Sequence, residues 1–441
     1  MSAESSKEAA GTNPRRKQSR LKWFYMFAGA NTVFMQCTIA GSLFALYMNE
    51  LGLNPARIGV LISLFPFMQT VSLISTPTVE RIGFKRSFLL FYGSRKLTVM
   101  AMALAPWILG FWGEGATFCF IAACIILFGL QRSLGETALY PWRKDFIPDH
   151  VRGRVGGIAN MVSMIAAGTG LYIASLVVEH GGEWGLGKTG AFQLAYVAFP
   201  LVGILGVLGM GRLPRAESPA TEHGKPFTSR LWQALKDRRL VRFLCGAGIM
   251  QGSLPLFAGF MPLFMKHEVG ISSGSIVRLT IAQMAGGFAA GYLSGRAADR
   301  FGSRPVIITL LIALATMPVF WVWMPLLSGW QLIAGMTVYF LFGAALFGTR
   351  IAEMRMMYNT VVPEERKSEY LAIRYSLVGI IAGCIPLFAG QSVNLFSDLE
   401  GTLLGVPLTP YTPLFAIAAV AWITAIFLLG GIEEEPATDA N

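Results

Sequence analysis

The sequence predicts an all-α membrane protein with twelve transmembrane helices in two pseudo-symmetric six-helix bundles. Three observations lead to this fold class: the composition, the lengths of the apolar runs, and two internal sequence matches. Of the 441 residues, 54% are hydrophobic and 14% are charged, whereas soluble domains carry about a quarter charged residues. A water-soluble globule with this balance would expose large apolar patches.

Twelve apolar runs have the length of roughly 20 residues that a helix needs to cross a bilayer. The first six lie at about residues 23–48, 57–79, 87–110, 116–139, 155–178 and 191–211. The other six lie at about residues 243–265, 273–295, 305–326, 331–352, 369–390 and 413–432. The first run is too long for a signal peptide, so we expect it to remain as a span.

The interval between the sixth and seventh runs divides the chain into two halves. We predict a basic cytoplasmic N-terminus, an N-terminal bundle, a cytoplasmic linker, a C-terminal bundle and an acidic cytoplasmic tail, at residues 1–22, 23–211, 212–242, 243–432 and 433–441. The linker ends in an amphipathic basic segment, Ser229 to Phe243. This segment is either an interfacial helix or a solvated tether.

Basic residues are distributed unevenly between the loops on the two sides. With both termini inside, the inner segments hold 27 of the 36 Lys and Arg residues, and the outer loops hold four, Arg57, Lys188, Lys266 and Arg278. Cytoplasmic loops of membrane proteins carry such an excess, so we expect cytoplasmic termini. Because the charge lies in short segments between apolar runs, the net charge of +11 does not indicate a nucleic-acid partner.

Two internal matches indicate that one half is a duplicate of the other. GRAADRFGSRP (Gly295 to Pro305) follows the eighth run, and TPTVERIGFKRS (Thr76 to Ser87) follows the second. IPDHVRGR (Ile147 to Arg154) similarly matches VPEERKSE (Val362 to Glu369). Parallel repeats related by an axis along the membrane normal are typical of one class of transporters.

The segment after the eighth run resembles the Gly-x-x-x-Asp-Arg-x-Gly-x-Arg signature of the major facilitator superfamily. Its matching residues are Gly295, Asp299, Arg300, Gly302 and Arg304. The first copy keeps Arg81 and Gly83 but has Glu80 in place of Asp and Thr76 in place of Gly. The resemblance extends from the first run to the twelfth, and it implies the fold of that family and secondary transport.

We interpret the signature as a conformational gate. Asp299 is expected to face the positive N-terminus of the fifth span near Gly156 and Gly157, and Arg300 and Arg304 to add bonds that hold the halves together. The alternative is that these residues only turn the chain and set its topology. The glycines of the eighth span, Gly287, Gly291 and Gly295, are expected to pack against the fifth span.

Ionisable residues within spans are energetically costly and therefore indicate function. The candidates are Arg132 and Glu136 in the fourth span, Arg350 and Glu353 at the tenth, and Arg374 in the eleventh. The resemblance implies that the fourth and tenth spans line the transport path. Structural alternatives are a permanent Arg132–Glu136 ion pair, a helix-end cap at Arg350 and Glu353, and an ion pair at Arg374.

Other polar residues within spans are weaker candidates for the same path. Asn31 and Gln36 in the first span and Gln251 in the seventh either contact the solute or bond neighbouring helices. Arg95 and Lys96 lie in the third span, roughly 14 Å from its inner end, and either pack structurally, reach the path or, in a lipid flippase, touch headgroups.

The sequence predicts a secondary transporter for a small organic solute. Because basic residues outnumber acidic ones inside the spans, we expect an anionic solute held by Arg132 and a proton accepted by Glu136. The alternatives are a neutral or cationic solute, drug or metabolite efflux, lysolipid flipping, and a non-transporting receptor or membrane-assembly factor. The fifth span lacks the Gly-Pro pair of the drug-antiporter branch.

No enzymatic or cofactor-binding motif accompanies these features. The sequence has no GxxxxGK[ST] phosphate loop, and its five cysteines lack metal-ligand spacing. We therefore expect no cofactor, no metal and no enzymatic activity. The expected partners are a small-molecule substrate, membrane lipids and protons, for a monomer in a multi-pass arrangement in a bacterial inner membrane.

Overall fold

The computed structural model describes residues 14–71, 78–79, 81–147, 151–214, 236–361, 367–399, 401–403 and 406–434. In the N-terminal half the elements are α2 (Pro14–Gln36), α3 (Ser42–Glu50), α4 (Pro55–Gln69), α6 (Phe84–Ala101), η1 (Met102–Leu104), α7 (Ala105–Phe146), α8 (Arg152–His180) and α9 (Gly187–Met210). In the C-terminal half they are α11 (Arg238–His267), α12 (Ser273–Phe301), α13 (Ser303–Val322), η3 (Met324–Leu326), α14 (Gln331–Met356), the π-helix η4 (Met357–Val361), α15 (Lys367–Leu395), β1 (Gly401–Leu403), β2 (Val406–Leu408) and α16 (Thr412–Gly430).

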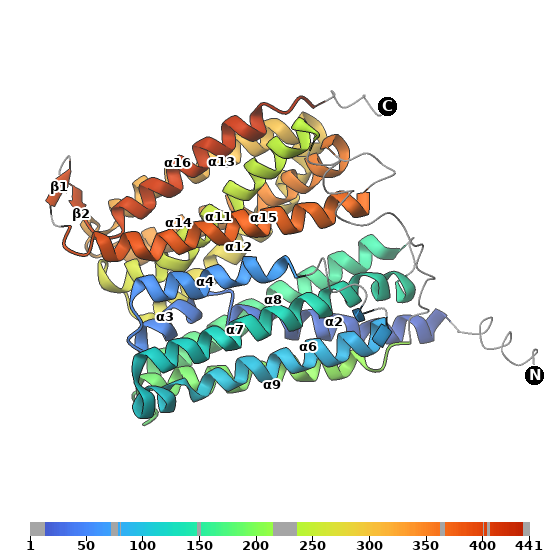
Figure 1. Ribbon diagram of the computed structural model, residues 1–441, viewed down its shortest axis with the longest axis horizontal. Helices are drawn as coiled ribbons and strands as arrows, with labels where there is room; N and C mark the ends of the chain where they lie inside the picture. The colour runs from blue at the N-terminus through green and yellow to red at the C-terminus, as the bar shows by residue number, and fades with distance from the viewer. Residues whose placement is uncertain are drawn as a thin grey trace, which may run out of the picture.

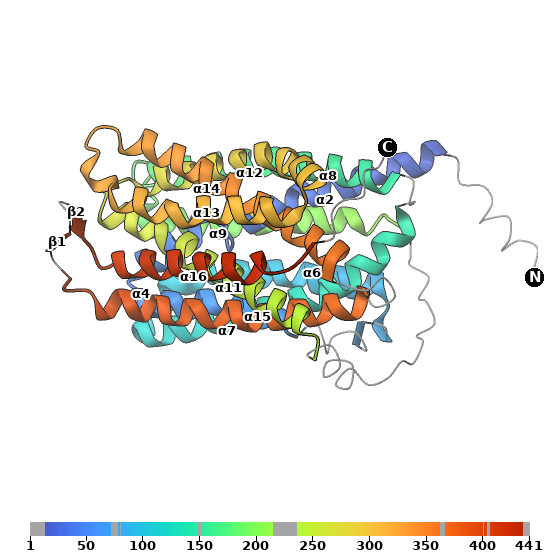
Figure 2. The same cartoon turned by 90° about the horizontal axis from the view of Figure 1, so that it is seen from above.

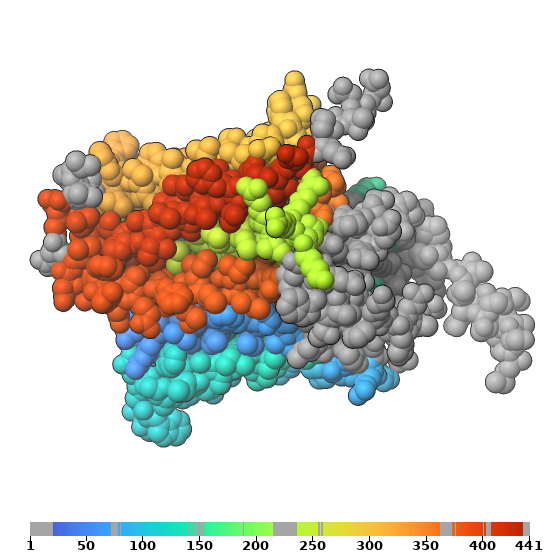
Figure 3. All heavy atoms as spheres, turned by 45° about the horizontal axis from the view of Figure 1, so that its top comes forward, coloured from blue at the N-terminus to red at the C-terminus, as the bar shows by residue number. Residues whose placement is uncertain are grey.

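The helices lie roughly along one direction in two layers, one from each half of the chain (Figure 1). The start of α2 and the end of α16 lie toward the same end of the bundle, opposite the antiparallel β1–β2 hairpin (Figures 1 and 2). Figure 3 shows the start of α11 beside the end of α16, where Arg242 donates hydrogen bonds to the carbonyl oxygens of Phe427, Leu428 and Gly431. These bonds satisfy the last carbonyls of α16, which a helix cannot pair internally.

Eight helical stretches of the described chain are long and apolar enough to cross a membrane. The longest, Phe84–Arg143, contains two of the predicted spans, separated by the non-helical Gly113 with φ +79°. Large apolar side chains are exposed on the outside of the bundle, including Leu205, Phe288, Phe388 and Phe427. A bilayer would cover such a surface, so the chain is a multi-pass integral membrane protein.

The first predicted span is interrupted, whereas the sequence predicts a continuous span. Residues 37–41 form a turn between α2 and α3, and Thr38 donates its hydroxyl to the carbonyl of Phe34 at 2.6 Å. A Cβ at Gly41 would lie 2.2 Å from the carbonyl oxygen of Gln36, so only glycine permits this close approach. Irregular backbone at membrane depth occurs where it lines a cavity or is buried in protein.

The internal duplication is visible in the backbone. Gly83 and Gly302, which occupy matching places in the two signature copies, have φ values of +88° and +87° and precede α6 and α13. Their amides donate to the carbonyls of Val79 at 2.9 Å and Ala298 at 3.1 Å. Because positive φ favours glycine, the same turn requires the same residue in both halves.

The two halves contact each other chiefly through α4 with α15 and α8 with α12. Small residues let α4 and α15 approach closely: a Cβ at Gly59 would lie 2.8 Å from the carbonyl oxygen of Pro386. The packing of α12 on α8 agrees with expectation, but the glycines predicted to form it, Gly287, Gly291 and Gly295, do not contact α8. A Cβ at Gly287 would lie 2.3 Å from the Phe347 ring, and Gly291 faces Ile351, so this glycine face packs against α14.

Candidate functional site

A cavity of about 360 Å³ lies between the halves. Its walls come from α2, the 37–41 turn and α3, α4 and α7 of the first half, and from α11, α12, α13 and α14 of the second. The broken first span therefore lines the cavity with its irregular segment. The polar residues of the lining, apart from Trp321, are Gln36, Ser42, Arg132, Gln251, Thr280, Gln283, Tyr339 and Arg350.

Arg132 and Glu136 lie on one face of α7, as their spacing predicted. The Arg132 Nε donates to Glu136 Oε1 at 2.8 Å, and the side chains are 29% and 35% exposed. Glu136 also accepts a bond from the Tyr92 hydroxyl at 3.3 Å. Only Arg132 of this pair lines the cavity. The Glu136 carboxylate therefore bonds to the guanidinium from a position outside the cavity lining.

The corresponding residues of α14 are arranged differently. Glu353 is buried and accepts bonds from Arg374 of α15 at 2.6 and 3.2 Å. Gln251 of α11 donates to the other Glu353 oxygen at 3.3 Å. Arg350 is exposed to the cavity, and within the described part of the chain it forms no ion pair. Helix-end capping is therefore not the role of Glu353.

Asn31 does not line the cavity, whereas Gln36, further along the same helix, does. The side-chain amide oxygen of Asn31, Oδ1, accepts from Arg95 Nη2 at 2.5 Å and from Lys96 Nζ at 2.9 Å. Both cations are buried, and the Arg95 guanidinium lies 3.5 Å from the centre of the Tyr92 ring. Arg95 and Lys96 thus pack within the N-terminal half, one of the readings allowed by the sequence.

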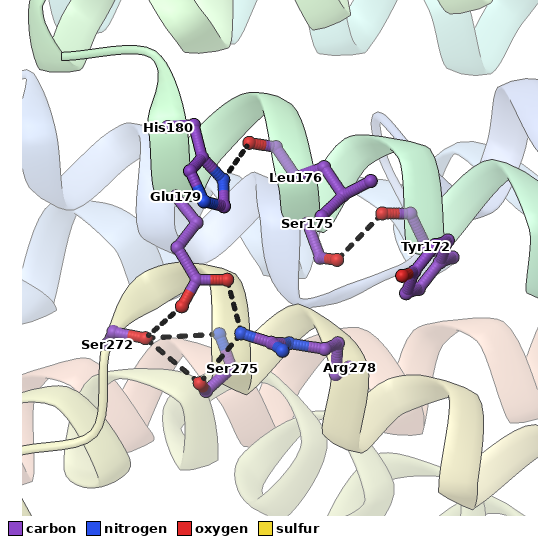
Figure 4. A network of polar contacts seen from close by, with 8 residues as sticks. All are labelled: Tyr172, Ser175, Leu176, Glu179, His180, Ser272, Ser275 and Arg278. Carbon is purple, nitrogen blue, oxygen red and sulfur yellow. Dashed lines mark hydrogen bonds and ion pairs between the residues drawn. The ribbon is translucent and has the colours of Figure 1, made fainter. Parts of the chain in front are cut away.

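Polar contacts between the halves gather at the end of the bundle that holds α3. Figure 4 shows Glu179 of α8 pointing toward Ser272, Ser275 and Arg278 at the start of α12, with an ion pair between Glu179 and Arg278. Nearby, Lys266 pairs with Glu50 at 2.5 Å. Ser42 and Thr280 share a hydrogen bond of 2.9 Å at the cavity wall. This end of the cavity is therefore closed by bonds between the halves.

A sequence profile described as Major Facilitator Superfamily matches residues 26–386. The chain belongs to the Major Facilitator Superfamily. It is 24% identical over 366 residues to a proline/betaine transporter from Salmonella typhimurium, covering 76% of this chain and 69% of the relative. Its relatives in this superfamily are transporters, not enzymes.

Solved structures of superfamily transporters share the fold. The nucleoside transporter NupG gives a TM-score of 0.69 at 13% identity, over 94% of this chain and 98% of that one. A bacterial homologue of the human lysosomal transporter Spinster, in an inward-facing and unoccupied conformation, gives 0.64 at 14% identity, over 95% of each chain. These likenesses confirm the predicted fold family.

The superfamily signature has a different set of contacts from those expected. Asp299 accepts a bond from Arg355 Nε at 3.1 Å, and Arg355 also donates to the Ser303 hydroxyl at 3.0 Å. Both partners belong to the C-terminal half. The backbone amides of Ser303 and Arg304 donate to the Glu434 carboxylate at 3.0 and 2.8 Å, so this acid caps α13.

The expected contact of Asp299 with the start of α8 is absent among the described residues. No described atom lies within 4 Å of a Cβ built at Gly157 or Gly295. Arg300 lies against the Phe301 ring of its own helix, and among the described residues it forms no hydrogen bond or ion pair with the N-terminal half. Arg81 is exposed, and Glu80 lies outside the described residues. Among the described residues, the polar contacts between the halves therefore lie at the α3 end, and none of them involves the signature.

Several cavity residues were not singled out from the sequence. Tyr339, Trp321, Phe342 and Phe347 line the cavity, but an aromatic residue in an apolar run looks the same whether it faces lipid, core or solute. Ser42 and Thr280 gave no signal either, because small hydroxyl residues are common in spans. Gln283, by contrast, is a polar candidate that the sequence indicates in the eighth span, since a glutamine within a span needs a polar partner or an aqueous cavity, and it lines the cavity.

Proposed function

We propose that the chain is a secondary transporter for a small organic anion and that the described conformation opens its cavity to the cytoplasm. The proposal includes twelve spans with both termini cytoplasmic, a monomeric transporter and, from the bacterial relative, a bacterial inner membrane. The predicted loops at the closed end are the outer ones, so closure there corresponds to an inward-facing state.

The observation that best supports an anionic substrate is the excess of positive charge around the cavity. Arg132 and Arg350 both line it, and no Asp or Glu does among the described lining residues. Arg95, Lys96 and Arg374 add to this charge, and Glu136 and Glu353 offset part of it. An uncompensated charge in a low-dielectric site costs several kcal/mol, and a bound anion would remove that cost.

Glu136 supports a proton-coupled mechanism. In the empty cavity it neutralises Arg132 through the 2.8 Å bond. When an anion binds the Arg132 guanidinium, the Glu136 carboxylate loses its closest cation. The loss of a nearby positive charge favours the protonated form of the acid. Anion binding and proton binding would then occur together. The structural alternative is a permanent ion pair with a neutral or cationic solute.

Transport in proteoliposomes tests the substrate class. Purified protein would first be screened by ligand-dependent shifts in melting temperature against mono- and dicarboxylates, organic phosphates, sugars, organic cations, and the zwitterions proline and betaine. Compounds that stabilise the protein would then be tested for uptake. The proposal expects an anion to be transported; uptake of cations or sugars alone would contradict it, and absence of any uptake would favour a non-transporting role.

The coupling is tested with three variants of the pair. Arg132→Gln should abolish anion transport, Arg132→Lys should retain part of it, and Glu136→Gln should keep exchange but remove its pH dependence. Arg296→Gln is the matched control because it removes one arginine charge from an exposed position of α12 outside the cavity. Normal transport by Arg132→Gln, or an unchanged pH profile in Glu136→Gln, would show that the pair is structural.

A further inference from the structure

The two cavity arginines lie on corresponding spans of the duplicated halves. Arg132 and Arg350 are 218 residues apart, which falls between the separation of 219 for Gly83 and Gly302 and that of 215 for Ile147 and Val362. Arg132 lies on the fourth predicted span of its half and Arg350 on the fourth of the other. Two basic side chains thus approach one cavity from opposite halves, near the axis that relates them.

The charges of these two arginines are balanced to different degrees. Glu136 bonds to Arg132, whereas Glu353 is occupied by Arg374 and Gln251. Arg350 forms no ion pair with any described residue, and the electrostatic attraction of Glu353 is opposed by repulsion from Arg374 and Arg132. An anion placed between Arg132 and Arg350 would offset this repulsion and contact both halves at once.

The remainder of the cavity wall is largely apolar and aromatic. Phe44 and Phe65 contribute from the first half, and Trp321, Tyr339 and Phe347 from the second. The Tyr339 side chain is 5% exposed, yet its hydroxyl has no hydrogen-bond partner among the described residues. A buried polar group normally has a partner, so a polar group of a bound solute that reaches this hydroxyl would satisfy it.

We propose that the cavity holds one small organic anion with an aromatic or similarly compact apolar body, clamped by Arg350 and Arg132. Arg350 takes the carboxylate first because no described acid forms an ion pair with it, Glu353 being bonded to Arg374 and Gln251. Arg132 leaves Glu136 and joins the same group as the halves close around it. The planar guanidinium donates two parallel bonds to a carboxylate, and the rings pack on the apolar body. This inference rests on the proposed anion transport and specifies its substrate class.

The size of the cavity agrees with a small ligand. Ligand pockets range from about 300 to 1,000 Å³, and this cavity of about 360 Å³ is near the lower limit. A compact aromatic acid fits such a space better than a lysolipid. A short aliphatic acid would leave the aromatic wall without contacts, and a neutral aromatic amide would leave Arg350 without a counter-ion.

Calorimetric titration with matched probes separates the contributions of charge and body. The probes are the aromatic carboxylates benzoate, phenylacetate and indole-3-acetate. Three controls accompany them: acetate lacks the aromatic body, benzamide lacks the negative charge, and benzylammonium carries a positive charge instead. At least one aromatic carboxylate should bind about tenfold or more tightly than acetate and benzamide, because bonds to charged groups contribute that much. Equal binding of acetate, or stronger binding of benzamide or benzylammonium, would overturn the substrate class.

Variants then test the clamp itself. Arg350→Gln should weaken binding of the best aromatic acid about tenfold or more, Arg350→Lys should restore part of it, and Arg296→Gln should bind as the parent. Tyr339→Phe should change the preference between the aromatic acids, because it removes only the hydroxyl. Size-exclusion profiles establish that each variant is folded, and unchanged binding by folded Arg350→Gln would overturn the clamp.

The outcomes also separate this inference from the proposed function. If dicarboxylates, organic phosphates or zwitterions are transported while no aromatic carboxylate binds, the aromatic substrate class is wrong and anion transport stands. If an aromatic acid is transported equally well by the parent and Arg350→Gln, the clamp is wrong. If only neutral or cationic compounds bind, both proposals are wrong.

Discussion

Glu353 bonds to Arg374 of the neighbouring helix at 2.6 Å, although Arg350 lies one turn before it on its own helix. The pair is almost completely buried, with side chains 1% and 5% exposed. Glu353 therefore balances a buried cation and leaves the Arg350 charge to the cavity. In the N-terminal half the corresponding acid, Glu136, remains with the cavity arginine, so the two halves use their embedded acids differently.

Breaking the buried pair should destabilise the protein. Arg374→Gln leaves Glu353 without its cation, and removing one partner of a buried ion pair costs about 3–5 kcal/mol. We expect a large fall in the detergent melting temperature, and weaker anion binding because Glu353 is then free to neutralise Arg350. The double variant Arg374→Gln/Glu353→Gln, with two amides in contact, should recover much of the stability. A single variant as stable as Arg296→Gln would contradict this account.

The network at the closed end should set the balance between conformations. Glu179→Gln removes the charge that joins α8 to Arg278 of α12. Pairs exposed to this extent contribute about 0.2–1 kcal/mol, so opening at this end should become up to about fivefold more frequent. Ser42→Cys, at a position now buried, would report opening on a cysteine-free background through its labelling rate with an impermeant thiol reagent.

A charge exchange provides the control for that measurement. Glu179→Arg combined with Arg278→Glu reverses the pair and should return labelling at position 42 toward the parent rate, whereas Glu179→Arg alone should accelerate it. The same labelling rate in all three proteins would show that the ion pair has no influence on the conformational balance.

Asp299 should affect the rate of transport more than substrate affinity. Its bond to Arg355 lies at the signature and away from the cavity. Asp299→Asn weakens an ion pair whose Asp299 side chain is 74% exposed. Such pairs contribute about 0.2–1 kcal/mol, so we expect turnover to fall by up to about fivefold, with the halves biased toward the inward-facing state. Uptake rates and binding affinities measured on the same preparation separate these effects. Unchanged turnover with a large loss of affinity would instead place Asp299 in substrate binding.

The orientation can be tested by chemical labelling in cells. The charge distribution predicts that residues 212–242 are cytoplasmic and residues 391–412 are external. On a cysteine-free background, Ser397→Cys should react with an impermeant reagent from outside, and Ser218→Cys should react only after permeabilisation. The reverse pattern would invert the topology and also exchange the inner and outer assignments of the cavity.

Much of the fold could be predicted because span length and hydrophobicity are properties of continuous segments. Most predicted runs coincide with a described helix, although the first is divided between α2 and α3 and α4 ends at Gln69 within the second; the glycine turn at Gly302 recurs at Gly83. The interruption at residues 37–41 was missed because it depends on the close approach of Gly41 to Gln36. Such an approach is a tertiary feature without a proline or charge to indicate it.

The candidate site could be predicted only where partners share a helix. The Arg132–Glu136 pair follows from a spacing of four residues, but the partners of Glu353 and Asp299 come from other elements. Helical periodicity likewise identified a glycine face on α12 without showing which helix it meets. It meets α14 because Phe347 fills the space beside Gly287.

Asn31 provides a test of whether the second basic cluster is structural. Its amide oxygen accepts from both Arg95 and Lys96, so Asn31→Leu leaves two buried donors without that acceptor. A buried donor without its partner costs about 1–3 kcal/mol, more when it is charged, and the melting temperature should fall. Asn31→Asp places a negative charge between the cations and should maintain or raise it. If Asn31→Leu instead melted normally but lost substrate affinity, Asn31 would belong to the transport path.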